Sequence, residues 1–277
     1  MNRNYKEIYS ESLKNPEEFW QKISEDVFWF KKPTKILNKN NPPFYKWFED
    51  GVTNTCYNAL DLHIDQGRGD KTALIYDSPI TGNKSKFTFK ELKEKVSKFA
   101  GALDKQGVKK GDRVIIYMPM IPEAVVAMLA CGRIGAIHSV VFGGFASNEL
   151  ASRIDDSKAK ILITASCGFE PGRTVEYRPL VDGALKLAKH QVEKVILFQR
   201  KGQEVKLNKP LEISWDEALS GADDKDCVEM GANDYAYILY TSGTTGIPKG
   251  IVRDIGGHIV ALKWTMKNIY NIDQDDV

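Results

Sequence analysis

The chain has 277 residues, of which 42% are hydrophobic, so it is long enough for one large domain or two ordinary ones with a sizeable core. Lys and Arg number 39 against 37 Asp and Glu, and a net charge of +2 gives no electrostatic footprint for nucleic acid. No apolar run approaches the roughly 18 residues of a transmembrane helix, so neither nucleic acid nor a membrane is expected as a partner.

Residues 1–70 differ in character from the rest of the chain and are expected to form an N-terminal helical extension. Pro16 suits a first helical turn and predicts a helix from 16 to about 30, whose apolar stripe would dock on the main domain. An aromatic stretch just before residue 50 is expected to form a short strand or wedge. Asn54 is expected to cap a further helix over 55–66.

From residue 71 to 277, segments of strand and helix character alternate, and this part is expected to be the main domain. Thr88 and Glu91 have the spacing of a capping box at the start of a helix that Gly107 ends. The predicted strands are 72–76, 86–89, 113–118, 137–142, 160–165 and 192–199, and the other predicted helices are 122–135, 148–155 and 178–190. Residues 200–230 are polar and are expected to interrupt the alternation of strands and helices before the strand that precedes the glycine-rich stretch. The alternation predicts an α/β fold with a doubly wound, mostly parallel sheet.

A glycine- and hydroxyl-rich stretch, YTSGTTGIPKG, follows the aromatic run 235–240, which has the character of a buried strand. Residues 257–270 after it have apolar residues at helical spacing. A loop between a strand and a helix is where α/β proteins hold phosphates, because glycines let backbone N–H groups approach an anion. The predicted phosphate-binding residues are Thr241, Ser242, Gly243, Thr244, Thr245, Gly246 and Lys249.

Two other interpretations of this stretch are weaker. A Gly/Ser/Thr linker does not normally follow a buried aromatic strand and end in Pro-Lys-Gly. The P-loop of nucleotide triphosphatases fails, because Pro248 stands where the second glycine is required and Gly250 replaces the Ser or Thr after the lysine.

The ungapped string resembles the phosphate-loop signature of the adenylate-forming enzymes, among them the AMP-forming acyl-CoA synthetases. The resemblance implies that the loop holds the β- and γ-phosphates of ATP while a carboxylate attacks the α-phosphate, with Mg²⁺ coordinated mainly by phosphate oxygens. Trp47-Phe48 and residues 56–61 (CYNALD) resemble the N-terminal extension of the short-chain, acetyl- and propionyl-type CoA synthetases.

Phe142, Gly143 and Gly144 end a predicted strand, where open α/β sheets bind ligands. From the residues alone, the glycines fit a tight strand–helix turn equally well. The resemblance implies that these three residues contact the adenine end of CoA, and that Gly172 and Arg173 meet a CoA phosphate. Without the family resemblance, Arg173 would be interpreted as a solvated charge at the end of a strand.

The sequence departs from the acetyl-type pattern in one place. Those members often carry a second arginine three residues before Arg173, where this chain has Glu170, so no second phosphate contact is assigned. Residues 170–177 and 251–254 (IVRD) resemble the propionyl-CoA synthetase-like branch instead. The four scattered histidines are interpreted as structural, and no residue is assigned as catalytic or as a metal ligand.

The four cysteines lie far apart in the sequence without a C-x-x-C pair, which indicates reduced thiols and neither a zinc site nor a disulfide framework. Glu7 and Glu11 near the start, with no apolar core, are unlike a secretory signal or a good mitochondrial presequence. We expect a cytoplasmic protein, although these features do not exclude the mitochondrial matrix.

The leading hypothesis is an AMP-forming ligase of acetate or propionate and CoA that works through an acyl-adenylate, with small-molecule substrates ATP, a short carboxylate and CoA. The chain ends at Val277, and the family's adenine, ribose and catalytic-lysine residues have no counterpart in it. We therefore expect an N-terminal fragment that is inactive alone and self-associates through an unpaired sheet edge. The alternatives are a truncated, non-catalytic protein that binds nucleotide or CoA, and an ATP-hydrolysing enzyme of another family.

Overall fold

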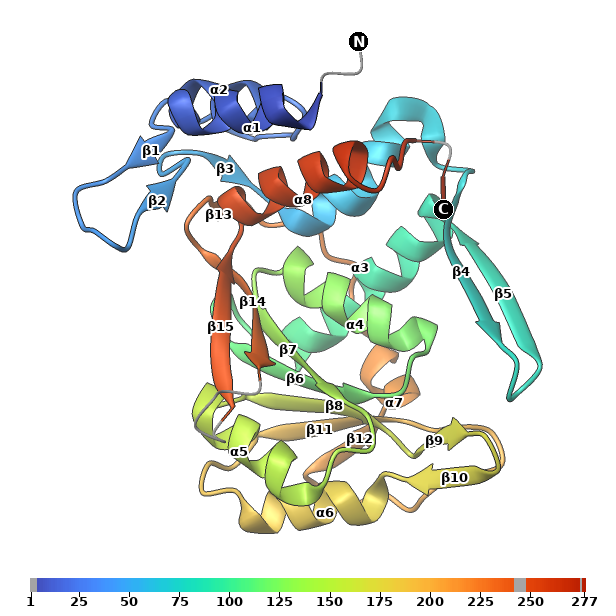
Figure 1. The fold of residues 1–277 in the computed structure, drawn as a ribbon. Coiled ribbons are helices and arrows are strands. Elements are labelled where there is room, and N and C mark those ends of the chain that lie inside the picture. Colours follow the sequence, from blue (N-terminus) through green and yellow to red (C-terminus); the bar gives the residue numbers. More distant parts are fainter. Residues whose placement is uncertain (1–3, 242–247, 275) are drawn as a thin grey trace.

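Figure 1 shows the computed structural model, which describes residues 4–241, 248–274 and 276–277. Among these residues the main sheet has seven strands in the order β12-β11-β8-β6-β7-β14-β15. Its strands are β6 (Arg113–Met118), β7 (Ile137–Phe142), β8 (Ile161–Ala165), β11 (Lys194–Phe198), β12 (Glu212–Ser214), β14 (Tyr235–Thr241) and β15 (Lys249–Asp254). All neighbours in the sheet are parallel except β14 and β15, which confirms the predicted mostly parallel α/β sheet.

The central strands β6 and β8 are mainly apolar because helices cover both faces of the sheet. β6 is buried from Val114 to Met118, and β8 is buried throughout. In Figure 1, α3 (Phe89–Lys105) and α4 (Pro122–Arg133) pack together on one face, and α5 (Ser147–Ser157) and α6 (Arg178–Leu187) pack on the other. The short α7 (Trp215–Leu219) joins α3 through Trp215 and Phe99, whose rings stack at 3.8 Å.

Local signals in the sequence predicted several element boundaries correctly. The capping box of α3 is present, since Glu91 N donates to Thr88 Oγ1 at 3.2 Å and Thr88 N donates to Glu91 Oε2 at 2.8 Å. Asn54 Oδ1 accepts from the backbone N of Tyr57 at 3.1 Å at the start of the helical segment that contains η1 (Tyr57–Asp61) and η2 (Ile64–Arg68).

The N-terminal extension packs on α8 (Gly256–Asn268) through α2 (Pro16–Ser24), and α1 (Tyr5–Lys14) lies against α2 (Figure 1). The Trp20 and Trp264 rings lie 6.3 Å apart, and Val260 of α8 joins a small apolar cluster with Trp29 and Phe48. The extension also contains β1 (Leu37–Asn38), β2 (Lys46–Trp47) and β3 (Val52–Thr53), and β3 pairs with the distant β13 (Met230–Gly231).

Other expectations were wrong in detail. The helix predicted over 16–30 ends at Ser24, and the separate helix α1 precedes it. β4 (Thr72–Ser78) and β5 (Asn83–Thr88) pair only with each other and project from the main sheet as a hairpin. A second hairpin, β9 (Cys167–Glu170) and β10 (Arg173–Glu176), occupies the stretch between the predicted strand 160–165 and the predicted helix 178–190, where no element was predicted. No helix among the described residues is long and apolar enough to cross a bilayer.

Candidate functional site

The glycine-rich stretch connects two antiparallel strands. The prediction that it leads directly into a helix was wrong, because β15 intervenes before α8 begins at Gly256. Ile251 and Val252 pair with Leu239 and Ile238 of β14, and this apolar ladder favours a second strand. The predicted phosphate ligands Ser242, Gly243, Thr244, Thr245 and Gly246 lie outside the described residues.

Thr241 and Lys249 flank that segment and are register partners across the hairpin. Both side chains are exposed. No ion pair joins Lys249 to any residue that the structure describes, so its ammonium group is available to an anion. Gly250 follows it in a crowded position, where a Cβ atom would lie 3.2 Å from both Ile238 Cγ2 and Tyr240 Cε1. The hairpin therefore presents a hydroxyl and a cation together at its tip.

Helix α5 supports the loop end of this hairpin through contacts that the sequence did not reveal. Tyr240 Oη donates to Asp156 Oδ2 at 2.6 Å, and burial together with this bond raises the pKa of Tyr240. The guanidinium of the buried Arg153 lies 5.3 Å from the centre of the Tyr240 ring and 5.4 Å from that of Phe145. Arg153 Nη1 also pairs with Glu149 Oε2 at 2.8 Å. The ion pair of Glu149 and Arg153 could have been expected from the sequence, because the two residues are four apart on a predicted helix. That spacing gives no indication that Arg153 contacts the rings of Tyr240 and Phe145.

The turn after β7 has its glycines for specific steric reasons. Gly144 has φ +95°, in the region that favours glycine, and its N–H donates to Tyr117 Oη at 3.1 Å. Tyr117 Oη in turn donates to the carbonyl of Phe145 at 2.8 Å, and burial raises the pKa of Tyr117 to about 12. A Cβ on Gly143 would lie 2.1 Å from Tyr177 Oη. Phe142 is 66% exposed beside this buried frame, so the turn presents an aromatic surface on a rigid support.

Gly143→Ala is expected to destabilise the chain by about 1–3 kcal/mol, because the added methyl would also lie 2.8 Å from the backbone carbonyl of Met118, and Tyr177 is buried. Urea unfolding followed by circular dichroism measures the change. Gly132→Ala is the matched control, since its Cβ would have ordinary contact with Cys56 Cβ at 3.9 Å. Equal stability of Gly143→Ala and wild type would mean that Tyr177 does not pack against the turn.

The hairpin β9–β10 contains the two residues expected to meet a CoA phosphate. Gly172 has φ +74°, as its position in the tight turn requires. Arg173 is 70% exposed at the side chain and is paired with Glu170, whose Oε2 lies 2.7 Å from both Nε and Nη2 of Arg173. A Cβ built on Gly144 would lie 3.8 Å from Val175 of β10, so this hairpin adjoins the Phe142–Phe145 turn. A phosphate on Arg173 would compete with Glu170.

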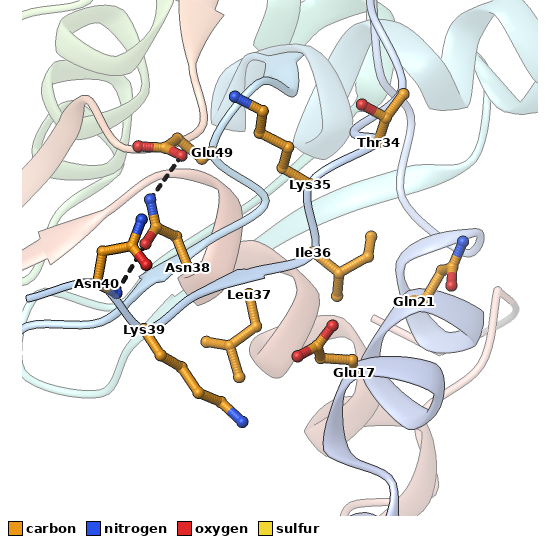
Figure 2. Close-up of a pocket in the computed structure, with 10 residues that line it drawn as sticks. All are labelled: Glu17, Gln21, Thr34, Lys35, Ile36, Leu37, Asn38, Lys39, Asn40 and Glu49. Atoms are coloured by element: carbon orange, nitrogen blue, oxygen red, sulfur yellow. Dashed lines mark hydrogen bonds between the residues drawn. The ribbon is translucent and has the colours of Figure 1, made fainter. Parts of the chain in front are cut away.

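A hollow of about 450 Å³ lies in the N-terminal extension, between α2 and β1 (Figure 2). Its lining mixes charges of both signs, because Glu17 and Glu49 line it together with Lys35 and Lys39. Asn38 already donates to Glu49 at 2.9 Å. All the lining residues fall between 17 and 49, so this hollow is separate from the strand ends that carry the hairpin and the turn.

Comparisons with known proteins identify the family of the chain. The family described as AMP-binding enzyme matches residues 63–277, and the family described as Acetyl-coenzyme A synthetase N-terminus matches residues 5–59. The chain belongs to the AMP-binding enzymes. The family resemblance inferred from the glycine-rich string and from the N-terminal aromatic residues is therefore confirmed.

Relatives of this AMP-binding chain extend well beyond it in length. The human protein named acyl-CoA synthetase short-chain family member 3, mitochondrial, is 52% identical over 274 residues, which are 99% of this chain and 40% of that protein. Acetyl-coenzyme A synthetase of Xylella fastidiosa is 44% identical over 281 residues, 99% of this chain and 43% of that protein. Acetoacetyl-CoA synthetase from Streptomyces lividans has a TM-score of 0.86 at 26% identity, covering 96% of this chain and 40% of that one. The chain spans about two fifths of the length of these relatives.

Proposed function

We propose that this chain carries the ATP-phosphate site and part of the CoA site of an AMP-forming ligase of short carboxylic acids. The observation that carries the proposal is the position of Arg153. Its guanidinium lies against both Tyr240, at the loop end of the β14–β15 hairpin, and Phe145 of the Phe142–Phe145 turn. In the proposal, residues 1–70 are the extension and 71–277 belong to the adenylating domain. The high identity to a short-chain acyl-CoA synthetase supports the substrate class.

The proposed chemistry begins with ATP phosphates held at the hairpin. Lys249 and Thr241, with the predicted ligands at 242–246, would bind the β- and γ-phosphates while a carboxylate attacks the α-phosphate to give acyl-adenylate and pyrophosphate. Donors already in place meet the charge that moves onto pyrophosphate without reorganisation. Mg²⁺ would be coordinated mainly by phosphate oxygens and would share this charge. The exposed Thr241 hydroxyl and Lys249 ammonium fit this role.

The second half-reaction would transfer the acyl group to CoA. The exposed Phe142 ring and the backbone of Gly143 and Gly144 would receive the adenine end of CoA. Gly172 and Arg173 would meet a CoA phosphate. The edge strand β15 exposes Ile251 and Val252, which supports the further proposal that the chain associates with itself when it is alone.

The test of the function uses a chimera in which this chain replaces the matching residues of the human relative. We expect ATP–pyrophosphate exchange that depends on acetate or propionate, because exchange reports the formation of acyl-adenylate. Comparison of the two acids identifies the preferred substrate. A folded chimera that binds nucleotide or CoA but shows no exchange with any short carboxylate would favour a non-catalytic binding role.

Arg173→Ala in the chimera is expected to raise the KM for CoA about tenfold or more, because a hydrogen bond to a charged group is lost. Acyl-adenylate formation should be unchanged. Glu170→Gln is the matched variant, and it should lower the KM for CoA up to about fivefold by removing a competitor whose exposed ion pair is weak. Loss of adenylation in Arg173→Ala with unchanged dependence on CoA would show that the residue is misassigned.

A further inference from the structure

A buried cluster of two thiols, a carboxylate and a guanidinium lies away from the proposed substrate sites. Arg133, at the end of α4, is completely buried. Its Nη1 lies 2.7 Å from Asp61 Oδ2, 3.1 Å from Cys227 Sγ and 3.6 Å from Cys56 Sγ, and its Nη2 lies 3.0 Å from Asp61 Oδ1. The two sulfur atoms and an Asp61 oxygen all lie within 4.8 Å of one another. Residues far apart in the sequence therefore meet around one cation.

A metal ion does not suit this cluster, although two thiols and a carboxylate are familiar zinc ligands. The Arg133 guanidinium already bonds to all three groups and so occupies the position that a metal ion would need. Expelling it would leave a fully buried cation without its partners, at a cost of several kcal/mol. The arrangement is therefore a pair of thiols beside a fixed positive charge.

The charges in the cluster favour one thiolate. Arg133 and Lys93 both contact Asp61, with Lys93 Nζ 3.1 Å from Asp61 Oδ1, so two cations face one buried carboxylate. The Asp226 carboxylate, 3.9 Å from Arg133, is fully exposed and therefore screened. A negatively charged thiolate at Cys56 would balance the second of these two positive charges.

The environments of the cysteines support this assignment. The neighbouring Cys227 thiol and the charge of Arg133 lower the pKa of Cys56 despite its burial, whereas the neighbouring Cys56 and burial raise the pKa of Cys227. The Cys227 thiol itself donates to Asp61 Oδ2 at 3.6 Å. Cys131 provides the contrast, because burial alone raises its pKa to about 12. Thiolate character, rather than proximity alone, determines which cysteine reacts with an oxidant.

We propose that Cys56 and Cys227 form a redox-active dithiol that hydrogen peroxide converts to a disulfide. The Cys56 thiolate attacks one peroxide oxygen, the O–O bond breaks, and Cys56 becomes a sulfenic acid while hydroxide leaves. The Cys227 sulfur then attacks the Cys56 sulfur, the S–O bond breaks, and the departing hydroxide takes the Cys227 proton to form water. The two thiols lose two electrons in total and the peroxide gains them.

The surrounding structure allows peroxide to reach the two thiols and allows the disulfide bond to form. Cys227 is partly exposed, and Cys56 lines a cavity of about 70 Å³ that reaches His138 and Tyr237. Closing the bond requires the sulfurs to approach to about 2 Å. Cys227 lies in the stretch 222–229, which contains no helix or strand, so a small movement there breaks no regular element. The bond would link the N-terminal extension to the segment that enters β13 and β14.

The test treats the purified chain with hydrogen peroxide, alkylates the remaining thiols after denaturation, and maps the tryptic peptides by mass spectrometry. We expect a peptide pair joined through Cys56 and Cys227 that dithiothreitol separates, with Cys131 and Cys167 still alkylated as free thiols. Cys131→Ser is the control and should leave the disulfide unchanged. A uniform pattern of oxidation across all four cysteines, or no linked pair, would overturn the proposal.

Single substitutions separate the two roles. In Cys227→Ser, which lies in the irregular stretch, Cys56 should stop at the sulfenic acid and be captured by dimedone. In Cys56→Ser, oxidation of Cys227 should slow by about tenfold or more, because the thiolate is gone. Preference of dimedone for Cys131 over Cys56 would contradict the assignment. Zinc alone is added in a parallel sample, and protection of both thiols by zinc would replace the redox site with a metal site.

Discussion

Asp61→Ala is expected to lower the free energy of unfolding of the chain by about 3–5 kcal/mol, because it leaves the buried Arg133 cation without its bidentate partner. Urea unfolding at neutral pH measures the loss. Asp70→Ala is the matched control: Asp70 pairs with Lys90 at 2.9 Å on the surface, and loss of that exposed pair should cost less than about 1 kcal/mol. Similar effects of the two substitutions would mean that the buried pair contributes no more than a surface one.

The same ion pair makes the stability depend on pH in a definite direction. Burial by itself would raise the pKa of Asp61, but the hydrogen bonds and charges of Arg133 and Lys93 lower it below its ordinary value. The stabilisation is therefore fully present above the unfolded pKa of about 4, and it disappears as the pH falls through the lower folded value. Asp61→Ala should lack this component of the acid transition, so the stabilities of variant and wild type should converge at low pH.

Replacing both partners separates charge from packing. Arg133→Met combined with Asp61→Leu removes both buried charges at similar volume, and such exchanges are often neutral or stabilising. We expect the double variant to recover most of the stability that Asp61→Ala loses. A double variant as unstable as Asp61→Ala would attribute the loss to the contacts of Arg133 with the neighbouring segment, such as its bond to the carbonyl of Lys225.

Lys249→Ala in the chimera with the human relative is expected to slow carboxylate-dependent ATP–pyrophosphate exchange by about 10–200-fold. That range corresponds to the loss of one hydrogen bond to a charged group, worth about 1.5–3 kcal/mol in the transition state. Lys249 begins β15, is exposed, and forms no ion pair with a described residue, so its removal should not affect the fold.

Lys84→Ala is the control for Lys249→Ala, because Lys84 is also an exposed hairpin lysine but lies on β5 of the separate β4–β5 hairpin, away from β15 (Figure 1). It should leave exchange unchanged. An unchanged exchange rate in Lys249→Ala, at unchanged stability, would remove the lysine from the proposed phosphate site. An equal fall of the exchange rate in both variants would indicate a general effect of surface charge.

The sequence by itself determined the elements whose signals are local. Strands β6 and β7 were predicted with their observed bounds, because short, mainly apolar runs between turn residues are typical of strands in a parallel sheet. The capping box of α3 is a contact between residues three apart, so the spacing of Thr88 and Glu91 was sufficient. The family followed from the ungapped glycine-rich string and from short N-terminal patterns such as Trp47-Phe48.

Only the tertiary structure decided which distant residues meet. β15 was missed because a strand after a glycine-rich loop depends on β14 as its pairing partner, whereas the helical spacing of α8 is visible from the sequence alone. Arg153 lies between Tyr240 and Phe145 because α5 packs beneath two strand ends, which no pattern along α5 encodes. Cys56 and Cys227 were interpreted as separate thiols from their spacing, and they became a pair only because α4 brings Arg133 between the extension and the stretch before β13. Periodicity reports the environment of one element, while such contacts depend on how several elements pack.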